Sequence, residues 1–363
     1  MKIVFDCRYV RFPRHDGISR YSASLVEALG RLHPVTMMIS DERQLAMLPD
    51  LPWVLGPSPT GPLEPITGAR INKFGQDIVF SPMQTIGPFG RRFALVTTIH
   101  DLIYYTNRTP PRNIPGPVRV LWRIYHLTWA FQRAVLNRAD AHLADSETTR
   151  DLMVKHHLSR HPITVVLLGT DRPPTLEKRT MPSAKKLVYM GTFMPYKNVD
   201  TVVKGMAQLP GYTLQLMSRV APAERARLEA LAPAGSLEFF DGASDEDYQA
   251  ALRGATALVT ASKDEGFGLP LVEAMAVGTP LVVSDIPIFR EIGGDVAGYF
   301  GVTSPESFAD TVKQLENGKL WAERSAAARD RSGLFDWDTA AAGLLTVLEE
   351  TYAKRSAHTR DGR

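Results

Sequence analysis

Short apolar runs of strand length alternate with helical patterns along most of the chain. In the first half the strand-like runs are KIVFDCRYV, VTMMIS, DIVFSP, FALVTTIH and AHLADS. Residues 18–32 have apolar side chains at helical spacing, and 117–138 and 146–157 are further helical candidates. Strands that alternate with helices favour a parallel sheet with helices on both faces. The pattern therefore predicts an α/β fold.

The alternation is interrupted at 171–186, where prolines and charged residues replace the periodicity. It restarts at KLVYMGT and runs on to a last helical segment, WDTAAAGLLTVLEETYAKR. A length of 363 residues also exceeds what one hydrophobic core usually supports. We therefore predict domains over 1–172 and 186–335, joined by a linker over 173–185, and a C-terminal helix over 336–363.

Two such domains on one linker place a cleft where the carboxyl ends of both sheets face each other. Ligands of open parallel sheets bind outside those ends. The stretch DEGFGLPLVEAMAVG, residues 264–278, follows the predicted strand TALVTAS and falls at such an edge.

The charge distribution is uneven along the chain. Residues 1–180 hold 23 Lys and Arg against 15 Asp and Glu, whereas 181–363 hold 19 against 24, and the net charge is +3. A basic first half attracts a phosphorylated substrate, an anionic membrane surface or nucleic acid, or else its arginines are scattered over a solvated face.

Cys7 is the single cysteine, which excludes an internal disulfide and a cysteine-based metal cluster. The start MKIVFDCRYV lacks the pattern of a signal peptide, and no apolar stretch approaches the roughly 20 residues of a membrane span. We expect a cytoplasmic protein.

The helical candidate within 112–138 interleaves arginines with Trp122, Tyr125, Trp129 and Phe131. Such a helix either docks on anionic lipid or buries its aromatic rings while its arginines reach solvent. The second reading is favoured, and contact with the inner face of a membrane stays an alternative.

The run GFGLPL, residues 266–271, matches only half of the G-x-G-x-x-G pattern, so a nicotinamide or flavin site is not expected. The glycines nevertheless let the backbone approach a phosphate, and a helix that begins near Leu269 points free N–H groups at an anion. Glu265 and Glu273 bracket this run. They belong either to an ordinary loop and helix or to a site for a ligand with hydroxyls and phosphates.

Further candidate residues lie at predicted strand ends and helix starts. Lys197 begins a helix, where a cation opposes the helix dipole, so it is a candidate partner of a phosphate. His100 ends the strand FALVTTIH and is either structural or a hydrogen-bond partner of a substrate hydroxyl. Gly17 lies in the first strand-to-helix loop and is either a plain turn residue or a point where the backbone approaches a ligand.

The run Asp245-Glu246-Asp247 has the D-x-D spacing of some metal sites. It follows Ser244 at the start of a predicted helix, where a Ser cap and acids in the first turn are favoured anyway. We therefore predict a cap there, and no metal site.

Taken together, the stretches DGISRY, TIHDL, DSETTRDL, MGTFMPYKN and ASKDEGFGLPLVEAMAVGTPLVVSD resemble retaining glycosyltransferase family 4, and the resemblance covers nearly the whole chain. It implies the GT-B fold, in which two Rossmann-like domains face each other across a cleft. The first domain would bind the acceptor and the second the nucleotide sugar. The C-terminal helix would cross back to the first domain.

The resemblance also implies roles for the candidate residues. Glu265 would bond the hydroxyls of the donor sugar, Lys197 would neutralise the diphosphate, and His100 would bond the sugar near the reacting carbon; these three are the expected catalytic residues. The resemblance implies that the sugar and diphosphate would be held by the backbone of Gly266, Phe267, Gly268 and Leu269. Glu273 would bond the ribose hydroxyls, Gly17 would approach the phosphate or the acceptor, and the segment 239–244 would border the base.

The implied reaction moves a sugar from a nucleotide diphosphate to an acceptor hydroxyl with retention, by a front-face displacement. It needs no tightly bound cofactor and no divalent cation. Thr192 stands where many relatives carry an arginine at the phosphate, and Arg219 is a candidate replacement. Ser19 stands where relatives often have glycine.

Segments like GTFMPYKN and DGISRY are frequent in mannosyltransferases of the family, so GDP-mannose is the first expected donor and an oligosaccharide or polysaccharide the acceptor. The chain resembles in particular the mycobacterial α-1,4-mannosyltransferases that build methylmannose polysaccharide. UDP-glucose, dTDP-rhamnose and a lipid-linked acceptor remain alternatives, and a non-catalytic sugar-binding protein is the rival from another class. No nucleic-acid partner is expected.

Overall fold

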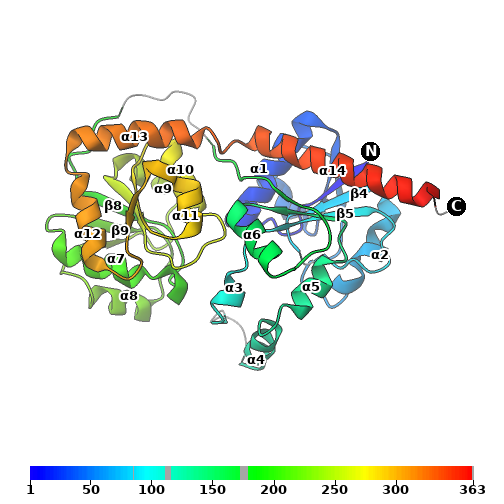
Figure 1. The fold of residues 1–363 in the computed structure, drawn as a ribbon, viewed down its shortest axis with the longest axis horizontal. Coiled ribbons are helices and arrows are strands. Elements are labelled where there is room, and N and C mark those ends of the chain that lie inside the picture. Colours follow the sequence, from blue (N-terminus) through cyan, green and yellow to red (C-terminus); the bar gives the residue numbers. More distant parts are fainter. Residues whose placement is uncertain (85, 111–115, 172–178, 362–363) are drawn as a thin grey trace. The chain divides into compact units, whose positions relative to one another are not determined.

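The computed structural model describes residues 1–361 apart from 85, 111–115 and 172–178. These residues form two units: unit 1 contains Met1–Gly169 and Phe335–Arg363, and unit 2 contains Thr170–Leu334. Each unit is built on one parallel sheet with helices around it (Figure 1). The predicted α/β class with two Rossmann-like units is thus confirmed.

Unit 1 has a seven-stranded sheet in the order β3-β2-β1-β4-β5-β6-β7, and every pairing in it is parallel. Its central strands are buried along their whole length because helices cover both faces. The strands are β1 (Ile3–Asp6), β2 (Val35–Ile39), β3 (Trp53–Leu55), β4 (Ile78–Ser81), β5 (Ala94–Ile99), β6 (Ala141–Ala144) and β7 (Ile163–Val165).

The helices of unit 1 come from both ends of the chain. They are α1 (Gly17–Leu32), α2 (Thr67–Ile71), α3 (Ile103–Thr106), α4 (Gly116–Tyr125), α5 (Ala130–Leu136), α6 (Glu147–Lys155) and α14 (Trp337–Asp361). The C-terminal helix α14 packs along α1 and contacts β4, β5 and β6 (Figure 1). A Cβ atom on Gly169 would lie 2.5 Å from the ring of Trp337, so only glycine permits this close approach.

The single helix predicted over 117–138 is wrong, because the chain breaks it into α4 and α5. The break allows Trp129, which precedes α5, to stack on Tyr105 of α3 with 3.9 Å between the ring centroids. Trp122, Tyr125 and Trp129 are partly buried, as the favoured reading expected, but the side chain of Phe131 is exposed.

Unit 2 has a six-stranded parallel sheet in the order β10-β9-β8-β11-β12-β13. The strands are β8 (Lys186–Tyr189), β9 (Thr213–Leu216), β10 (Leu237–Phe239), β11 (Ala257–Thr260), β12 (Leu281–Ser284) and β13 (Gly298–Phe300). The helices are α7 (Val199–Gly205), α8 (Pro222–Glu229), α9 (Asp245–Gly254), α10 (Leu269–Ala276), α11 (Pro287–Gly293), α12 (Pro305–Gln314) and α13 (Gly318–Ser332).

The core of unit 2 is centred on fully buried aromatic side chains, among them Trp321, Tyr189 and Phe308. The indole N–H of Trp321 donates to the Thr256 carbonyl at 2.8 Å, so the one polar atom of that ring is satisfied. Of the predicted linker, residues 172–178 lie outside the described residues. Arg179 is fastened to unit 2, since its guanidinium donates to the carbonyls of Val277 and Arg253.

Six short 3₁₀ turns complete the described fold. They are η1 (Glu42–Met47), η2 (Glu64–Ile66), η3 (Asn72–Phe74), η4 (Pro195–Lys197), η5 (Met206–Gln208) and η6 (Gly294–Val296). No helix of the described residues is long and apolar enough to cross a membrane.

In each sheet the order of the strands reverses at the strand that comes first in the sequence: earlier strands are added on one side of it and later strands on the other. The strand β1 lies between β2 and β4, and β8 lies between β9 and β11. At such a switch point the loops above the carboxyl ends diverge and leave a crevice for a ligand. The two units fill this place differently.

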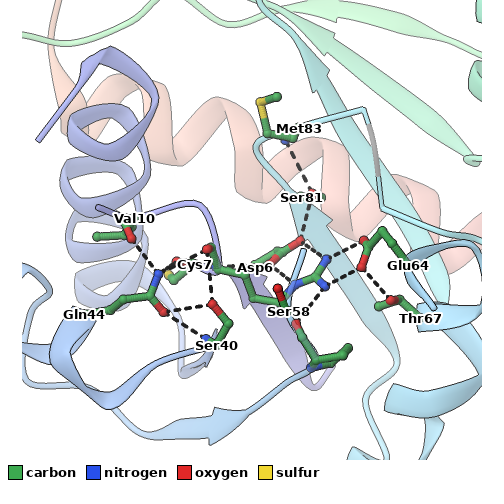
Figure 2. A network of polar contacts seen from close by, with 12 residues as sticks. Asp6, Cys7, Val10, Ser40, Gln44, Ser58, Glu64, Thr67, Ser81 and Met83 are labelled. Carbon is green, nitrogen blue, oxygen red and sulfur yellow. Dashed lines mark hydrogen bonds and ion pairs between the residues drawn. The ribbon is translucent and has the colours of Figure 1, made fainter. Parts of the chain in front are cut away.

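In unit 1 a buried ion network occupies the switch point (Figure 2). Arg8 Nε donates to Asp6 Oδ1 at 2.8 Å, and Arg8 Nη1 donates to Glu64 Oε2 at 2.9 Å. Ser81, at the end of β4, donates to Asp6 Oδ2 at 3.1 Å. Burial alone lowers the pKa of Arg8, but the two carboxylates outweigh it and raise the pKa. The network ties the irregular connection before α2 to the sheet edge.

Candidate functional site

The switch point of unit 2 carries an ion pair between two loops. Lys197 follows β8, Glu265 follows β11, and Lys197 Nζ lies 2.6 Å from Glu265 Oε1. The two side chains are 18% and 13% exposed, so the pair is shielded from solvent but not fully buried. This is the place in a parallel sheet where a ligand binds.

Glu265 is held by hydroxyl groups at the same sheet edge. Ser262 Oγ donates to Glu265 Oε1 at 2.7 Å, and Thr260 Oγ1 lies 3.2 Å from Ser262 Oγ. Ser284, at the end of β12, donates to the Ser262 carbonyl at 2.6 Å. Because Ser262 Oγ and Lys197 Nζ both donate to Oε1, and Ser262 is itself held by Thr260 and Ser284, the carboxylate is oriented before any ligand binds.

The loop that carries Lys197 is fixed by its own backbone geometry. Asn198 has the left-handed conformation, with φ of 51°, and its side chain donates to the carbonyls of Ala261 and Val302 at 3.1 and 2.7 Å. The Lys263 N–H donates to the Tyr196 carbonyl at 2.8 Å, which joins this loop to the one that carries Glu265. Lys197 lies two residues before α7, so the carboxylate of Glu265 compensates a cation that would otherwise face only the positive helix end.

The glycine turn beside Glu265 leads into α10. Gly268 has φ of 98° and ψ of 50°, and a Cβ there would lie 3.2 Å from the Phe289 ring. The conformation favours glycine, and the helix begins at Leu269 with Pro270 in its first turn. Phe267 is buried and anchors the turn. The N-terminus of α10 therefore opens at the same edge as Lys197 and Glu265.

Glu273 lies one helical turn beyond Leu269 on α10 and is half-buried. Gly266 precedes Phe267 in the turn and is buried. Unit 2 thus brings Lys197, Glu265 and the glycine turn together at one edge, with Glu273 on the helix that starts there.

Two further residues of unit 2 follow strands at this edge. Thr192 is exposed after β8, and its carbonyl accepts a hydrogen bond from Tyr189 at 2.9 Å. Arg219 is exposed after β9, and a Cβ on Gly242 would lie 2.7 Å from its Cγ. The stem of Arg219 therefore rests on the segment at 239–244.

The D-x-D run is a helix cap, as predicted. The Asp247 N–H donates to Ser244 Oγ at 3.0 Å, and Asp247 Oδ2 accepts from Ser244 Oγ at 2.7 Å. No group of three or more His, Cys, Asp or Glu suited to a metal ion occurs among the residues that the structure describes.

In unit 1, His100 follows β5 at the carboxyl edge and has partners for both ring nitrogens. Nδ1 lies 2.5 Å from Asp145 Oδ2, and Nε2 lies 2.7 Å from the Pro82 carbonyl. Burial by itself lowers the pKa of His100, but the charge of Asp145 and the hydrogen bonds to Asp145 and Pro82 outweigh it, so the pKa is raised above its ordinary value. A protonated ring donates at both positions.

Gly17 is the exposed first residue of α1, and Asp16 caps that helix by accepting from the Ser19 N–H at 2.9 Å. Ser19 Oγ accepts from the Arg11 N–H at 3.0 Å and lies 2.6 Å from His15 Nδ1. The serine therefore braces the loop before the helix. Tyr21, two residues beyond Ser19, meets the ring of His100 edge-on with 4.9 Å between the ring centroids.

Two functional candidates were missed in the sequence. Asp145 is only 2% exposed, its Oδ1 has no hydrogen-bond partner among the described residues, and it fixes His100. Ser262 orients Glu265. The signal for Asp145 was present, because it follows the strand run AHLA as His100 follows its own strand.

Two family models match most of the chain. Residues 15–172 match the model described as Glycosyltransferase Family 4, and residues 175–331 match the model described as Glycosyl transferases group 1. The first match lies in unit 1 except for its last residues, and the second lies in unit 2.

Three curated relatives are mannosyltransferases by name. An O-antigen chain mannosyltransferase of Salmonella typhimurium is 25% identical over 237 residues, which are 63% of this chain and 66% of the relative. A GDP-mannose-dependent α-(1-6)-phosphatidylinositol dimannoside mannosyltransferase of Mycobacterium tuberculosis is 31% identical over 170 residues, 46% of this chain and 44% of the relative. The MMP α-(1→4)-mannosyltransferase of Mycolicibacterium hassiacum is 25% identical over 282 residues, 73% of this chain and 67% of the relative. The chain thus spans between 44% and 67% of the length of these relatives.

Among solved structures, the sucrose-phosphate synthase of Thermosynechococcus elongatus superposes with a TM-score of 0.73 at 20% identity, over 97% of this chain and 99% of that one. The likeness concerns the fold. The chain has the GT-B fold, and the two family models, which match consecutive parts of the chain, show that it belongs to glycosyltransferase family 4.

Proposed function

We propose that the protein is a retaining glycosyltransferase that transfers mannose from GDP-mannose to a hydroxyl of an oligosaccharide or polysaccharide. The observation that carries the proposal is the ion pair of Lys197 with Glu265 at the switch point of unit 2, beside the glycine turn. A cation, an oriented carboxylate and a helix N-terminus at one edge suit a ligand that bears both phosphates and hydroxyls.

In this proposal Lys197 and the backbone N–H groups of Gly266–Leu269 hold the diphosphate. When the nucleotide sugar binds, the ammonium of Lys197 turns partly from Glu265 to the phosphate oxygens, and the carboxylate is released to accept from the sugar hydroxyls. Glu273 accepts from the ribose hydroxyls. Arg219 adds a second cation near the phosphates, in the role that Thr192 cannot fill.

The transition state resembles an oxocarbenium ion, and negative charge develops on the departing diphosphate. Stabilising that charge is the main contribution of the protein, so Lys197 matters most for the rate. The bond from the anomeric carbon to the phosphate oxygen breaks, the bond to the acceptor oxygen forms on the same face, and the leaving phosphate oxygen takes the acceptor proton. His100 bonds the transferred sugar through Nε2, whose N–H turns from the Pro82 carbonyl to a sugar hydroxyl while Nδ1 stays on Asp145.

The choice of donor is supported by the three relatives described above, which are mannosyltransferases by name, and one of them is named as GDP-mannose-dependent. The acceptor is a glycan, and a mannose polysaccharide is the first choice. The charge on the diphosphate is met by protein cations and N–H groups, so a divalent cation is not required.

To test this proposal, the purified protein is incubated with one donor (GDP-mannose, UDP-glucose or dTDP-rhamnose) and one acceptor (a short mannoside or glucoside). Each reaction is run with and without a chelator of divalent cations. Release of the nucleoside diphosphate, the mass of the product and the anomeric configuration by NMR are measured. Glu273→Ala is the site variant, and Glu229→Ala, an exposed acid on α8, is its control. Turnover of GDP-mannose with retention, lost only in Glu273→Ala and unchanged by the chelator, supports the proposal.

Turnover of another donor would replace mannose by that sugar. Failure of every donor to turn over, together with no binding of any nucleotide in calorimetry, would overturn the transferase proposal. If a nucleotide binds but no combination of donor and acceptor gives turnover, a sugar-binding protein is favoured.

A further inference from the structure

The chain after β4 carries a glutamine whose side-chain amide is oriented by the fold. Gln84 Oε1 accepts from Gln132 Nε2 at 2.5 Å, and Gln132, on α5, is only 1% exposed. Gln132 Oε1 in turn accepts from the hydroxyl of Tyr125 at 3.0 Å and from that of Tyr105 at 3.5 Å. Gln84 is therefore the outer end of a polar network that starts inside unit 1.

The two tyrosines set the direction of the hydrogen bonds in this network. A phenol hydroxyl has one hydrogen to donate, and Gln132 Oε1 accepts that hydrogen from both Tyr105 and Tyr125. If the Gln132 amide were turned the other way, both hydroxyls would lose this acceptor. The direction therefore continues to Gln84, whose Oε1 is used by Gln132. Its Nε2 keeps two N–H groups that no described residue accepts, and the side chain is half-exposed.

Gln84 lies at the same sheet edge as His100. The strands β4 and β5 are parallel neighbours, with Ser81 opposite Thr97. The chain that leaves β4 passes His100 directly, because the Pro82 carbonyl lies 2.7 Å from His100 Nε2. Gln84 follows two residues later. Two N–H donors are thus presented beside the histidine to which the proposed function assigns the transferred sugar.

The segment 81–84 is fastened at both ends. At its start, Ser81 Oγ donates to Asp6 Oδ2 at 3.1 Å, and the Met83 N–H donates to Ser81 Oγ at 3.4 Å (Figure 2). At its end, the amide of Gln84 is held by α5. A donor on a segment fixed in this way needs little further ordering when a ligand binds, and this favours a specific contact.

We propose that Gln84 recognises the acceptor, by donating from Nε2 to the oxygens of two neighbouring hydroxyls on the acceptor sugar. A neutral amide with two N–H groups suits uncharged oxygens, whereas a cation such as Lys197 suits the diphosphate. Gln132 is a positioning residue, because it acts only through Gln84. This assignment rests on the proposed transfer to a glycan hydroxyl and adds a residue that selects the glycan.

The first experiment compares the kinetics of Gln84→Glu with those of the unchanged chain. The glutamate keeps an oxygen that accepts from Gln132 and loses both N–H groups, so it separates the ligand contact from the tie to α5. We expect an unchanged melting temperature and a KM for a short mannoside acceptor that is about tenfold higher. The value of kcat, the KM of the donor and hydrolysis of the donor without acceptor should not change.

Monodeoxy derivatives of the same mannoside identify the contact itself. With the unchanged chain, the derivative that lacks a bonded hydroxyl should lose about tenfold in kcat/KM, and with Gln84→Ala the same deletion should cost nothing further. Gln132→Met should also raise the acceptor KM, because the Gln84 amide is then no longer held. Gln314→Glu, the same substitution on an exposed residue of α12, is the control and should change none of these values.

The inference is overturned if Gln84→Glu leaves the acceptor KM unchanged, or if it raises the KM of the donor instead. It is also overturned if every deoxy effect is additive with Gln84→Ala. Binding of the mannoside alone is followed by saturation-transfer NMR. If the unchanged chain turns over no donor but binds the mannoside, and Gln84→Glu does not bind it, the transfer proposal fails and the glycan contact stands. If neither chain binds the mannoside and no donor is turned over, both proposals fail.

Discussion

Lys197 Nζ lies 2.6 Å from Glu265 Oε1, although the two residues are 68 positions apart and come from loops after different strands. In this arrangement the charge of each residue is satisfied by the other. The ammonium of Lys197 is therefore available for a phosphate, and until the phosphate binds, Glu265 spares it the cost of an unpaired charge in a largely buried place.

Replacing Lys197 by alanine should lower kcat/KM by about 100-fold or more, because the charge on the departing diphosphate loses its main partner. Initial rates with the turned-over donor measure the effect. Lys185→Ala, which breaks an exposed pair with Glu316, is the control and should change nothing. Wild-type kcat/KM in Lys197→Ala would remove this residue from the reaction.

Gly268→Ala should destabilise unit 2 by about 1–3 kcal/mol, because φ of 98° is strained for a residue with a Cβ. The measurement is urea unfolding followed by near-UV circular dichroism. Gly318→Ala is the counterpart, since that glycine starts α13 with open space around its Cβ position, and it should be neutral or slightly stabilising. Equal stabilities of the two variants would contradict the strain.

The pKa of His100 is raised in the folded chain, so its proton adds stability below the unfolded value of 6.5. That stability is lost as the pH rises through the raised pKa. The difference in melting temperature between the wild type and Asp145→Asn should therefore be largest near pH 6 and shrink towards alkaline pH. A difference that does not change with pH would mean that Asp145 does not hold an imidazolium.

Arg8→Met should destabilise unit 1 by about 3–5 kcal/mol, because the buried carboxylate of Asp6 and that of Glu64 lose their counter-charge. Replacing all three together, with Asp6→Asn, Arg8→Met and Glu64→Gln, should cost less than Arg8→Met alone. Chemical unfolding monitored at tryptophan fluorescence gives both values. Arg225→Met, which breaks an exposed pair, should cost less than about 1 kcal/mol.

The sequence predicted the alternation of strands and helices because buried parallel strands leave short apolar runs and helices leave a 3.6-residue spacing. It also singled out Lys197, Glu265 and the glycine turn as candidates, since each lies in the segment between a strand run and the next helix. The order of the strands, and hence the switch points, could not be read, because pairing between strands is a long-range property.

The buried pairs were the hardest features to anticipate. In the sequence, Asp6 and Arg8 only interrupt an apolar run. Their role depends on Glu64, which lies in an irregular connection more than fifty residues later and pairs with Arg8. Asp145 acquires its role only because β5 and β6 are neighbours. The break between α4 and α5 accompanies the stack of Trp129 on Tyr105, a contact between distant residues that no local pattern encodes.

The C-terminal helix α14 packs on α1, so unit 1 is assembled from both ends of the chain, whereas unit 2 is contiguous. During synthesis on the ribosome, α1 is made early, but α14, the helix on which it packs, is made only after residue 336. Unit 2 can complete its fold during that interval, although it is made later. Synthesis from the N-terminus therefore allows unit 2 to be completed before unit 1, whereas the N-terminal domain of a chain usually folds first.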